Sequence, residues 1–563
     1  MMGPETIESK PHTPVYKMHK YFARRPWNVF RALIQRHSNA GEIIMDPFMG
    51  GGVTVVESLR LKRKVIGIDV NPLASFITRM EAAPLDIDRF QEARRVITSR
   101  VKKEIQSLYA TKCPDCGKTA VADWLEWKET ERQIKRIKYD CNHCGGSGIK
   151  HPLPEDVAQA KRIENEFDAT IQDRNLWFPK TEVPPGDKTS SLLNSGITHF
   201  NQLYTRRNLL ALAILLKEIN QANPATREFL KFTFSSCLKW CSRQSHLRGS
   251  IIEGWAMHAY WVYPNSLELN VWNTLERRFD AVLRGKKFSN EEIGEFYKAA
   301  EKFTDLKHDA SCLLLNRSSS SLPLPDNSVD AIVTDPPYGG NVNYGELADY
   351  WWIWLCHGKI IEKDEEAVIN RTRRKSIREY EDALTSAFKE CFRVLKPGRQ
   401  FVSTFNSKNA AVVTAFITAA ARAGFDINTK GISYQAPIKA YTTTFHAMQV
   451  GAFVGDFIFT FAKPDKPHRV TTTPSSDDIS DFKNRLEGII SSGIKNQMTD
   501  SQLREVAYKH LIPYVASHTS TPENCRQATE FFESKMRESS AHFRSRRKSI
   551  IEVRRRTFRK ALI

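Results

Sequence analysis

The residues best suited to chemistry in this chain form one tetrapeptide, Asp335-Pro336-Pro337-Tyr338, directly after the apolar run 329–334. A β-branched run that stops at two prolines predicts a buried strand, and open α/β sheets bind ligands where their strands end. The Asp335 carboxylate and the Pro336 carbonyl can accept the two N–H bonds of an exocyclic amine on a planar base. The Tyr338 ring offers a face on which an extruded base can stack. The tetrapeptide therefore indicates methylation of a base amine, the alternative being a strand-ending turn capped by aspartate.

A second motif lies near the N-terminus, where the predicted strand 43–46 leads into the glycines 50–52 and then into a predicted helix. The next predicted strand, 65–68, ends at Asp69. Glycines let a ligand approach the backbone closely, and an acidic residue at a strand end can hold both ribose hydroxyls. The spacing differs from that of a dinucleotide site, so together with the tetrapeptide this βαβ unit predicts binding of S-adenosylmethionine. The residues predicted to hold this methyl donor are Asp46, Phe48, Gly50, Gly52, Asp69 and Asn71.

The two motifs together resemble those of the adenine-specific DNA methylases that carry a zinc-ribbon module. Further similarity lies in Asn343–Trp354, in Lys20–Pro26 and in Tyr204–Leu209, and it extends over most of residues 10–465. In that family the first two residues of the tetrapeptide bind the target amino group, and the tyrosine stacks on the flipped base. The glycine turn and the acidic strand end hold the donor. The resemblance thus gives target-base roles to Asp335, Pro336 and Tyr338, and donor roles to Gly50, Gly52 and Asp69.

The resemblance implies a site-specific DNA methyltransferase that acts on adenine N6. An aspartate at the first tetrapeptide position favours adenine N6, because serine is commoner there in the cytosine-N4 enzymes. Three alternatives stay open: a cytosine-N4 DNA methyltransferase, a guanine-N2 RNA methyltransferase with a similar tetrapeptide, and a catalytically silent DNA-binding subunit. A role in restriction-modification or phage defence, with partner subunits of such a system, follows from the family resemblance alone.

Two Cys-x-x-Cys pairs, each followed by glycine, stand about two dozen residues apart. This spacing predicts a zinc ribbon in which four thiolates close a tetrahedral structural site, with accidental pairs or disulfides as the alternative. The predicted ligands are Cys113, Cys116, Cys141 and Cys144. The segment between the pairs is basic, which suits either a solvated hairpin face or a DNA contact; its cations are Lys128, Arg132, Lys135, Arg136 and Lys138.

The overall composition agrees with an intracellular enzyme of nucleic acids. The 563 residues carry a formal net charge of +19, which suits a polyanionic partner. No apolar stretch is long enough to span a membrane and no secretory signal is present, so we expect a cytoplasmic, nucleoid-associated prokaryotic protein. Eleven Lys and Arg residues against two glutamates lie between Lys535 and Ile563. This segment predicts a basic helix that either clamps the phosphate backbone or packs its apolar stripe on the body of the protein.

Four segments near the motifs complete the predicted site. Residues 21–35 are predicted to form a helix that turns its Arg24-Arg25-Pro26 sequence toward the donor pocket or DNA. The glycine-rich loop 339–341 is suited to closing over a flipped base. The aromatic run 350–354 predicts a helix packed on the sheet, and the basic loop 371–375 predicts a phosphate contact.

The predicted fold is of the α/β class, with a Rossmann-like methyltransferase sheet of about seven strands. An inserted zinc ribbon and helical region split this sheet, and a helical C-terminal domain follows it. The predicted domains are the donor-binding half (1–110), the zinc ribbon (111–150), a helical insertion for target recognition (151–310), the half with the tetrapeptide (311–465) and a basic helical domain (466–563).

Overall fold

The computed structural model describes residues 7–255, 257–427, 431–435, 455–465 and 477–560, without the side chains of 477, 542 and 544–560. The strands of its central sheet are β1 (Ile43–Asp46), β2 (Lys64–Asp69), β10 (Ala299–Ala300), β11 (Cys312–Asn316), β12 (Ala331–Thr334), β13 (Gln400–Phe405), β14 (Ile432–Gln435) and β15 (Asp456–Ala462). Their order is β10-β11-β2-β1-β12-β13-β15-β14. The strands from β10 to β13 are mutually parallel, and β15 runs antiparallel to both of its neighbours. The predicted α/β class is confirmed as a mixed sheet with helices.

The sheet has eight described strands where about seven were predicted. The edge strand β10 has only two residues, both alanines, so no apolar run marks it in the sequence. The strand β14 is also short, with four residues, and was not predicted from the sequence. Short edge strands of this kind carry little pattern, whereas the buried central strands have the β-branched runs that predicted them.

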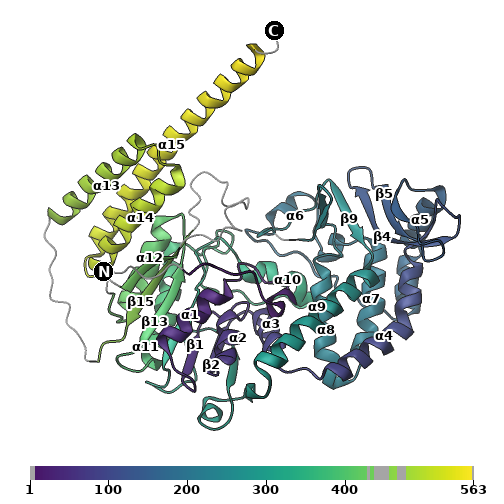
Figure 1. The fold of residues 1–563 in the computed structure, drawn as a ribbon, viewed down its shortest axis with the longest axis horizontal. Coiled ribbons are helices and arrows are strands. Elements are labelled where there is room, and N and C mark those ends of the chain that lie inside the picture. The colour runs from purple at the N-terminus through teal and green to yellow at the C-terminus, as the bar shows by residue number, and fades with distance from the viewer. Residues whose placement is uncertain (1–6, 256, 428–430, 436–454, 466–476, 561–563) are drawn as a thin grey trace.

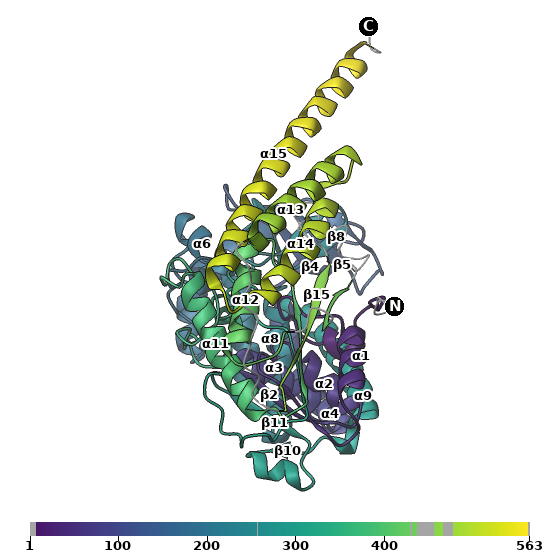
Figure 2. The same cartoon turned by 90° about the vertical axis from the view of Figure 1, so that its left-hand side faces the viewer.

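Helices cover both faces of the sheet because successive residues of each strand point to opposite sides. Ile44 and Val65 pack with α1 (Trp27–His37), α2 (Val53–Arg60) and α3 (Pro72–Ala82) on one face. Their neighbours Met45 and Ile66 pack with α11 (Ile377–Val394) and α12 (Ala410–Arg422) on the other. Figure 2 shows α11 and α12 on one side of the strands and α1 and α2 on the other. The parallel strands are therefore buried on both faces, which explains their continuous apolar sequences.

The helix predicted over 21–35 is wrong in its first part, because α1 begins only at Trp27. Pro26 stands at the N-cap, and a proline disfavours helical backbone in the residue before it. Ala23 has a φ of 55°, in the left-handed region that a helix excludes. Residues 21–26 therefore form a bent segment that leads the chain toward the ends of the strands.

A long insertion separates α3 from β10. Its antiparallel strand β9 (Asn265–Leu269) pairs with β4 (Thr119–Lys128) of the cysteine-bearing segment, so the helical region and that segment share one sheet. Figure 1 shows this insertion to one side of the central sheet. Its other strands and α-helices are α4 (Ile87–Ser107), β3 (Ala110–Lys112), β5 (Gln133–Asp140), β6 (Ser147–Lys150), α5 (Pro154–Asp173), α6 (Ser190–Asn194), α7 (Arg206–Asn220), α8 (Pro224–Leu238), β7 (His246–Arg248), β8 (Ile251–Glu253) and α9 (Val271–Glu292).

The aromatic run after the tetrapeptide lies in α10 (Tyr344–Leu355), and Tyr350, Trp351 and Trp354 are each no more than 1% exposed. The run is buried as predicted, but its partners are α3 and, in the insertion, α8 and Trp255, where the sheet was predicted. Three further helices end the chain: α13 (Asp477–Lys495), α14 (Asp500–Ser517) and α15 (Pro522–Lys560). The backbone of the basic segment is helical and projects from the body in Figure 1. Its side chains from 544 onward lie outside the described residues, so the DNA clamp stays a prediction. None of the helices in the described part of the chain is long and apolar enough to cross a membrane.

Candidate active site

Three adjacent strands bring the two sequence motifs together at one edge of the sheet. Asp46 ends β1, Asp69 ends β2, and Asp335 follows β12, with β1 in the middle of the three. The strand order reverses between β1 and β12, which is where open α/β sheets form a binding crevice. A cavity of about 500 Å³ lies there, lined by both motifs. This volume is in the usual range of small-molecule sites.

Asp69 shapes the glycine turn that borders the cavity. Its two carboxylate oxygens accept the N–H groups of Gly50 at 2.9 Å and of Asn71 at 2.8 Å. Gly50 has a φ of 46°, a left-handed conformation that glycine adopts without strain. Burial raises the pKa of Asp69 to about 7 in spite of these two hydrogen bonds. Each carboxylate oxygen keeps a free lone pair, so Asp69 can still accept hydroxyl groups from a ligand.

The walls around this turn fit a polar nucleoside-like ligand such as S-adenosylmethionine. The Nδ2 of Asn71 is buried and has no hydrogen-bond partner among the described residues, while its Oδ1 accepts the Leu73 N–H at 3.0 Å. A buried donor without a partner costs free energy unless a ligand or water satisfies it. The ring of Tyr21 lies so close to the turn that a Cβ on Gly50 would stand 3.1 Å from it. Glycine therefore keeps this side of the cavity open.

Five of the six residues predicted to hold the donor line the cavity, and Gly52 does not. Gly52 lies behind the turn, where a Cβ would stand 2.6 Å from the Thr78 hydroxyl. Asp46 is buried and accepts the Thr334 hydroxyl at 2.6 Å, and burial raises its pKa to about 6. Its side chain thus ties β1 to β12 beneath the cavity. Phe48 is half-buried at the rim.

The tetrapeptide residues lie at the second end of the same cavity. One oxygen of Asp335 accepts hydrogen bonds from the Thr404 hydroxyl, at 2.6 Å, and from the Tyr338 hydroxyl. The Tyr338 ring packs edge-on against Phe405, with 4.8 Å between centroids. The Pro337 carbonyl accepts the Tyr380 hydroxyl at 2.6 Å, which braces the turn. Asp335 and Pro337 line the cavity, whereas Pro336 and Tyr338 are not part of its lining. The structure therefore brings two of the four tetrapeptide residues into the cavity that five of the predicted donor residues line.

Several contacts of the site were not predicted from the sequence. Arg25 donates to Asp335 at 2.6 Å and to Asp456 at 3.1 Å, and Tyr344 stacks on Tyr21 with 5.9 Å between centroids. The prediction did place Arg25 near the donor pocket or DNA, but gave it no partner. Asp456 opens the antiparallel strand β15, whose first residue lies where the parallel strands end. The sequence does show an aspartate at the start of this strand. Only a strand that runs antiparallel to its neighbours places its first residue at the site, and the sequence does not show that direction.

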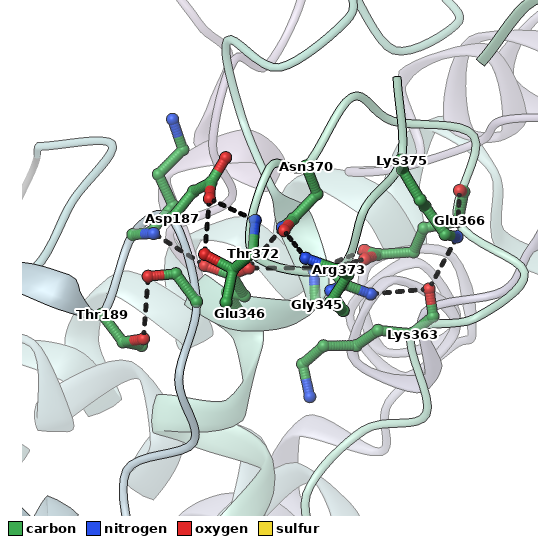
Figure 3. A network of polar contacts seen from close by, with 12 residues as sticks. Asp187, Thr189, Gly345, Glu346, Lys363, Glu366, Asn370, Thr372, Arg373 and Lys375 are labelled. Atoms are coloured by element: carbon green, nitrogen blue, oxygen red, sulfur yellow. Dashed lines mark hydrogen bonds and ion pairs between the residues drawn. The ribbon is translucent and has the colours of Figure 1, made fainter. Parts of the chain in front are cut away.

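A network of buried polar groups holds the loop 363–375 beside the cavity (Figure 3). The carboxylate of Glu346 in α10, itself 2% exposed, accepts the Lys188 N–H at 2.7 Å and the Asn370 amide at 2.5 Å. Glu366, which lines the cavity, accepts the Gly345 N–H at 2.6 Å and Arg373 at 3.0 Å. The network thus joins the insertion, α10 and the loop 363–375 beside the cavity.

The insertion also contacts the glycine-rich loop after the tetrapeptide. The Lys188 ammonium group donates to the carbonyls of Gly340 and Asn341, at 3.1 Å each. Asp187 accepts the backbone N–H groups of Arg371, at 3.0 Å, and Thr372, at 3.1 Å. Asp187 and Lys188 of the insertion therefore hold the two loops that lie beside the tetrapeptide, the glycine-rich loop 339–341 and the loop 363–375.

Replacing Glu346 with alanine should destabilise the loop 363–375. The Lys188 N–H and the Asn370 amide would lose their acceptor in a buried place, at a cost of about 2–4 kcal/mol. We expect faster proteolysis at this loop and a lower midpoint of thermal unfolding. Glu362→Ala is the matched control, because Glu362 is exposed in the same region. Equal proteolysis of the two variants would contradict the role given to Glu346.

The four predicted cysteine ligands form one cluster in the insertion. Their sulfur atoms all lie within 4.8 Å of one another. The distances from Cys113 to Cys144 and from Cys116 to Cys141 are both 3.7 Å, far longer than a disulfide bond. A tetrahedral zinc ion with Zn–S bonds of about 2.3 Å separates its sulfurs by about 3.8 Å. The cluster is therefore compatible with zinc. The glycines after the two pairs, Gly117 and Gly145, have φ values of 71° and 74° and turn the chain around the cluster.

The basic residues of two segments are largely paired within the protein. Lys128 pairs with Glu131, and both Lys135 and Arg136 pair with Glu126, which favours the solvated hairpin face over a DNA contact. In the loop 371–375, Arg373 and Lys375 are half-buried in the network around Glu366, whereas Arg371 and Arg374 are exposed. Only the exposed pair of this loop is placed to meet a phosphate.

Comparison with known proteins gives three similarities. Residues 5–77 match the model of a DNA methylase family of the N6/N4 type. The chain is 20% identical over 411 residues to the Type II methyltransferase M.MjaII of Methanocaldococcus jannaschii, covering 70% of this chain and 72% of that protein. A crystal structure of a candidate DNA modification methylase from Thermus thermophilus aligns at 17% identity with a TM-score of 0.16, over 28% of this chain and 58% of that one. The first two similarities confirm the resemblance to N6/N4-type DNA methylases.

Proposed function

We propose that this protein is an S-adenosylmethionine-dependent DNA methyltransferase that methylates the exocyclic N6 amine of an adenine flipped out of the helix. The observation that supports this most is the position of Asp335, at the end of β12 and on the wall of the cavity that Asp69 and the glycine turn also line. A hydrogen-bond acceptor for an amine and the residues proposed to bind the methyl donor thus line one cavity.

The residues of this chain can carry the proposed reaction by positioning and electrostatics. S-adenosylmethionine, when bound, supplies an electrophilic methyl group. Asp335 and the Pro336 carbonyl accept the two N–H bonds of the target amine, which localises the lone pair on the nitrogen. The Tyr338 ring supports the extruded base, and binding in a fixed orientation lowers the barrier. The N–C bond would form as the S–C bond breaks, with S-adenosylhomocysteine as the leaving group, and the amine would then lose one proton to Asp335 or to solvent. No covalent enzyme intermediate is needed, and no cysteine of the described chain lines the cavity.

Three alternatives differ from this proposal in the base or in the chemistry. Methylation of cytosine N4 would use the same residues, and the aspartate at position 335 is the feature that favours adenine. The family match is to DNA methylases, which favours DNA over an RNA guanine. A silent DNA-binding subunit would not need the buried Asn71 donor and the open glycine turn.

Partner subunits of a restriction or defence system stay a prediction. We also propose a structural zinc ion at the cysteine cluster.

Mass spectrometry of nucleosides tests the proposed function directly. DNA is incubated with the protein and isotopically labelled S-adenosylmethionine, and then digested. We expect the label in N6-methyldeoxyadenosine. Label in N4-methyldeoxycytidine would reassign the base while keeping the mechanism, and label only in guanine of a parallel RNA incubation would overturn the DNA assignment. Donor binding without any label would favour the silent subunit.

The affinity for the methyl donor should fall when Asp69 is replaced by asparagine and when the pH is lowered. The ionised carboxylate accepts both ribose hydroxyls in the proposed complex, and losing that charge should weaken binding by about 3 kcal/mol, or about 100-fold. Because burial raises the pKa of Asp69 to about 7, the wild-type protein should lose donor affinity as the pH falls from 8 to 6, where the carboxyl becomes protonated.

Calorimetric titration with the donor at the two pH values provides this measurement. Asp88→Asn is the control, because Asp88 is an exposed acid outside the cavity. In the Asp69→Asn variant the donor affinity should change little between pH 6 and pH 8. This result would assign the pH dependence to Asp69 rather than to the nearby Asp46. A wild-type affinity that does not change between pH 6 and pH 8 would contradict the proposed role.

A further inference from the structure

One arginine fills the space beside the predicted catalytic aspartate. The guanidinium group of Arg25 donates from Nε to Asp335 at 2.6 Å and from a terminal nitrogen to Asp456 at 3.1 Å. A second terminal nitrogen contacts the Tyr338 hydroxyl. The guanidinium carbon lies 4.8 Å from the centre of the Tyr338 ring. Arg25 therefore contacts both residues that the proposed reaction assigns to the target base.

These contacts reproduce the pattern that a flipped base would make. A base that carries an exocyclic amine is planar, presents N–H donors to the carboxylate and lays its face on the tyrosine. The guanidinium group is also planar, presents N–H donors in a fixed fork and stacks on aromatic rings. Arg25 and the base therefore need the same carboxylate and the same ring.

Arg25 and a base amine would compete for the same oxygen of Asp335. One oxygen accepts the hydroxyls of Thr404 and Tyr338, and the other accepts Arg25. The side chains of Arg25 and Asp335 are 17% and 16% exposed, so little room is left between them for a third group. A base amine that is to reach this oxygen while its ring lies on Tyr338 must displace the guanidinium group.

Asp456 gives Arg25 a second anchor that is independent of Asp335. The two carboxylates belong to different strands, since Asp456 opens β15 and Asp335 follows β12. The backbone at Arg25 is constrained by the proline that follows it, so a displacement must occur in the long side chain. An arginine side chain has enough rotatable bonds to leave one carboxylate while it keeps the other.

We propose that Arg25 occupies the target-base position in the DNA-free protein and that an incoming base displaces it from Asp335 and Tyr338 onto Asp456. The identity of the base rests on the proposed function, whereas the displacement rests on the contacts of Arg25. Arg25 thereby excludes free nucleosides, because only a base delivered by bound DNA gains enough binding free energy to displace it.

The test measures binding of free deoxyadenosine to the full-length protein, with deoxycytidine as a parallel probe. Binding is followed by saturation-transfer NMR or calorimetry in the presence of S-adenosylhomocysteine, so no turnover is needed. We expect Arg25→Ala and Arg25→Lys to bind one of the two nucleosides at least about tenfold more tightly than the wild type, because the competing side chain is gone. Lysine keeps the positive charge near Asp335 and Asp456, but it lacks the planar fork.

Arg31→Lys is the matched control, because Arg31 pairs with Glu57 at 3.3 Å and does not line the cavity. Nucleoside affinities of both Arg25 variants that stay at the wild-type value would overturn the proposal and make Arg25 a fixed part of the acceptor site. Tighter nucleoside binding in a protein that labels no DNA would support the displacement of Arg25 while the proposed function fails. The two proposals therefore fail separately.

Discussion

Methyl transfer to DNA is expected to fall by about two to three orders of magnitude when Asp335 is replaced by alanine, a loss typical of removing one preorganised electrostatic contact. Asp335 is the carboxylate on the cavity wall that meets Thr404, Tyr338 and Arg25. Without it the target amine loses an acceptor and its lone pair stays delocalised in the ring. Single-turnover methylation with labelled donor measures the loss, since it reports the chemical step apart from product release.

Donor binding separates this effect from a general loss of structure. The Asp335→Ala protein should bind S-adenosylmethionine with nearly the wild-type affinity, because Gly50, Asp69 and Asn71 line the other end of the cavity. Thr404→Val provides a graded comparison: it removes one hydrogen bond to the carboxylate and should lower the rate only modestly. Retained turnover in Asp335→Ala would overturn the catalytic assignment.

The central part of the fold could be predicted because its signals are local. The β-branched residues of β1, β2 and β12 mark buried parallel strands, and each strand ends at a residue of the site. Once three neighbouring strands end at one edge, Asp46, Asp69 and Asp335 must lie close together. The cysteine pairs are equally local, since two Cys-x-x-Cys-Gly turns specify a cluster without knowledge of the rest of the fold.

The remaining part of the site depends on contacts between distant segments. Arg25 meets Asp456 across 431 positions of the chain, and no pattern near either residue predicts that pair. The start of α1 was misplaced because the apolar periodicity was followed through Pro26. The loop around Glu366 is ordered by buried ion pairs with Arg373 and by Glu346, and the sequence shows these only as a charged surface loop.

The contacts of Asp187 and Lys188 suggest how the insertion and the catalytic half act together. Both residues precede α6 in the insertion, and both hold loops that follow the tetrapeptide or line the cavity. A shift of the insertion on DNA would therefore be transmitted to the loops beside Asp335 through direct hydrogen bonds. The insertion also carries the cysteine cluster, and strand β4 of the cysteine-bearing segment pairs with β9.

Removal of a zinc ion from the proposed site at the cysteine cluster should therefore disorder β9 as well as residues 110–150. We expect one zinc ion per chain by elemental analysis, and a large loss of order when a chelator removes it or when Cys116 is replaced by serine. Structural zinc sites contribute apparent binding free energies of about 10–16 kcal/mol. The cluster itself has only Ala120 and Tyr139 as buried apolar neighbours, so this end of the segment should depend on the metal, whereas Leu125 and Ile137 belong to the main core. Hydrogen exchange should rise first in residues 110–150 and then in β9.

Amide exchange in the central sheet distinguishes local unfolding of the insertion from global unfolding of the protein. Amide exchange in β1, β2 and β12 should stay slow in the Cys116→Ser protein, because these strands are buried between helices that do not contact the cluster. Cys356→Ser is the matched control, since Cys356 is half-buried and lies outside the cluster. Unchanged protection of residues 110–150 in a metal-free protein would show that the ribbon folds without zinc. In that case the 3.7 Å sulfur separations would reflect packing of the two turns rather than a metal centre.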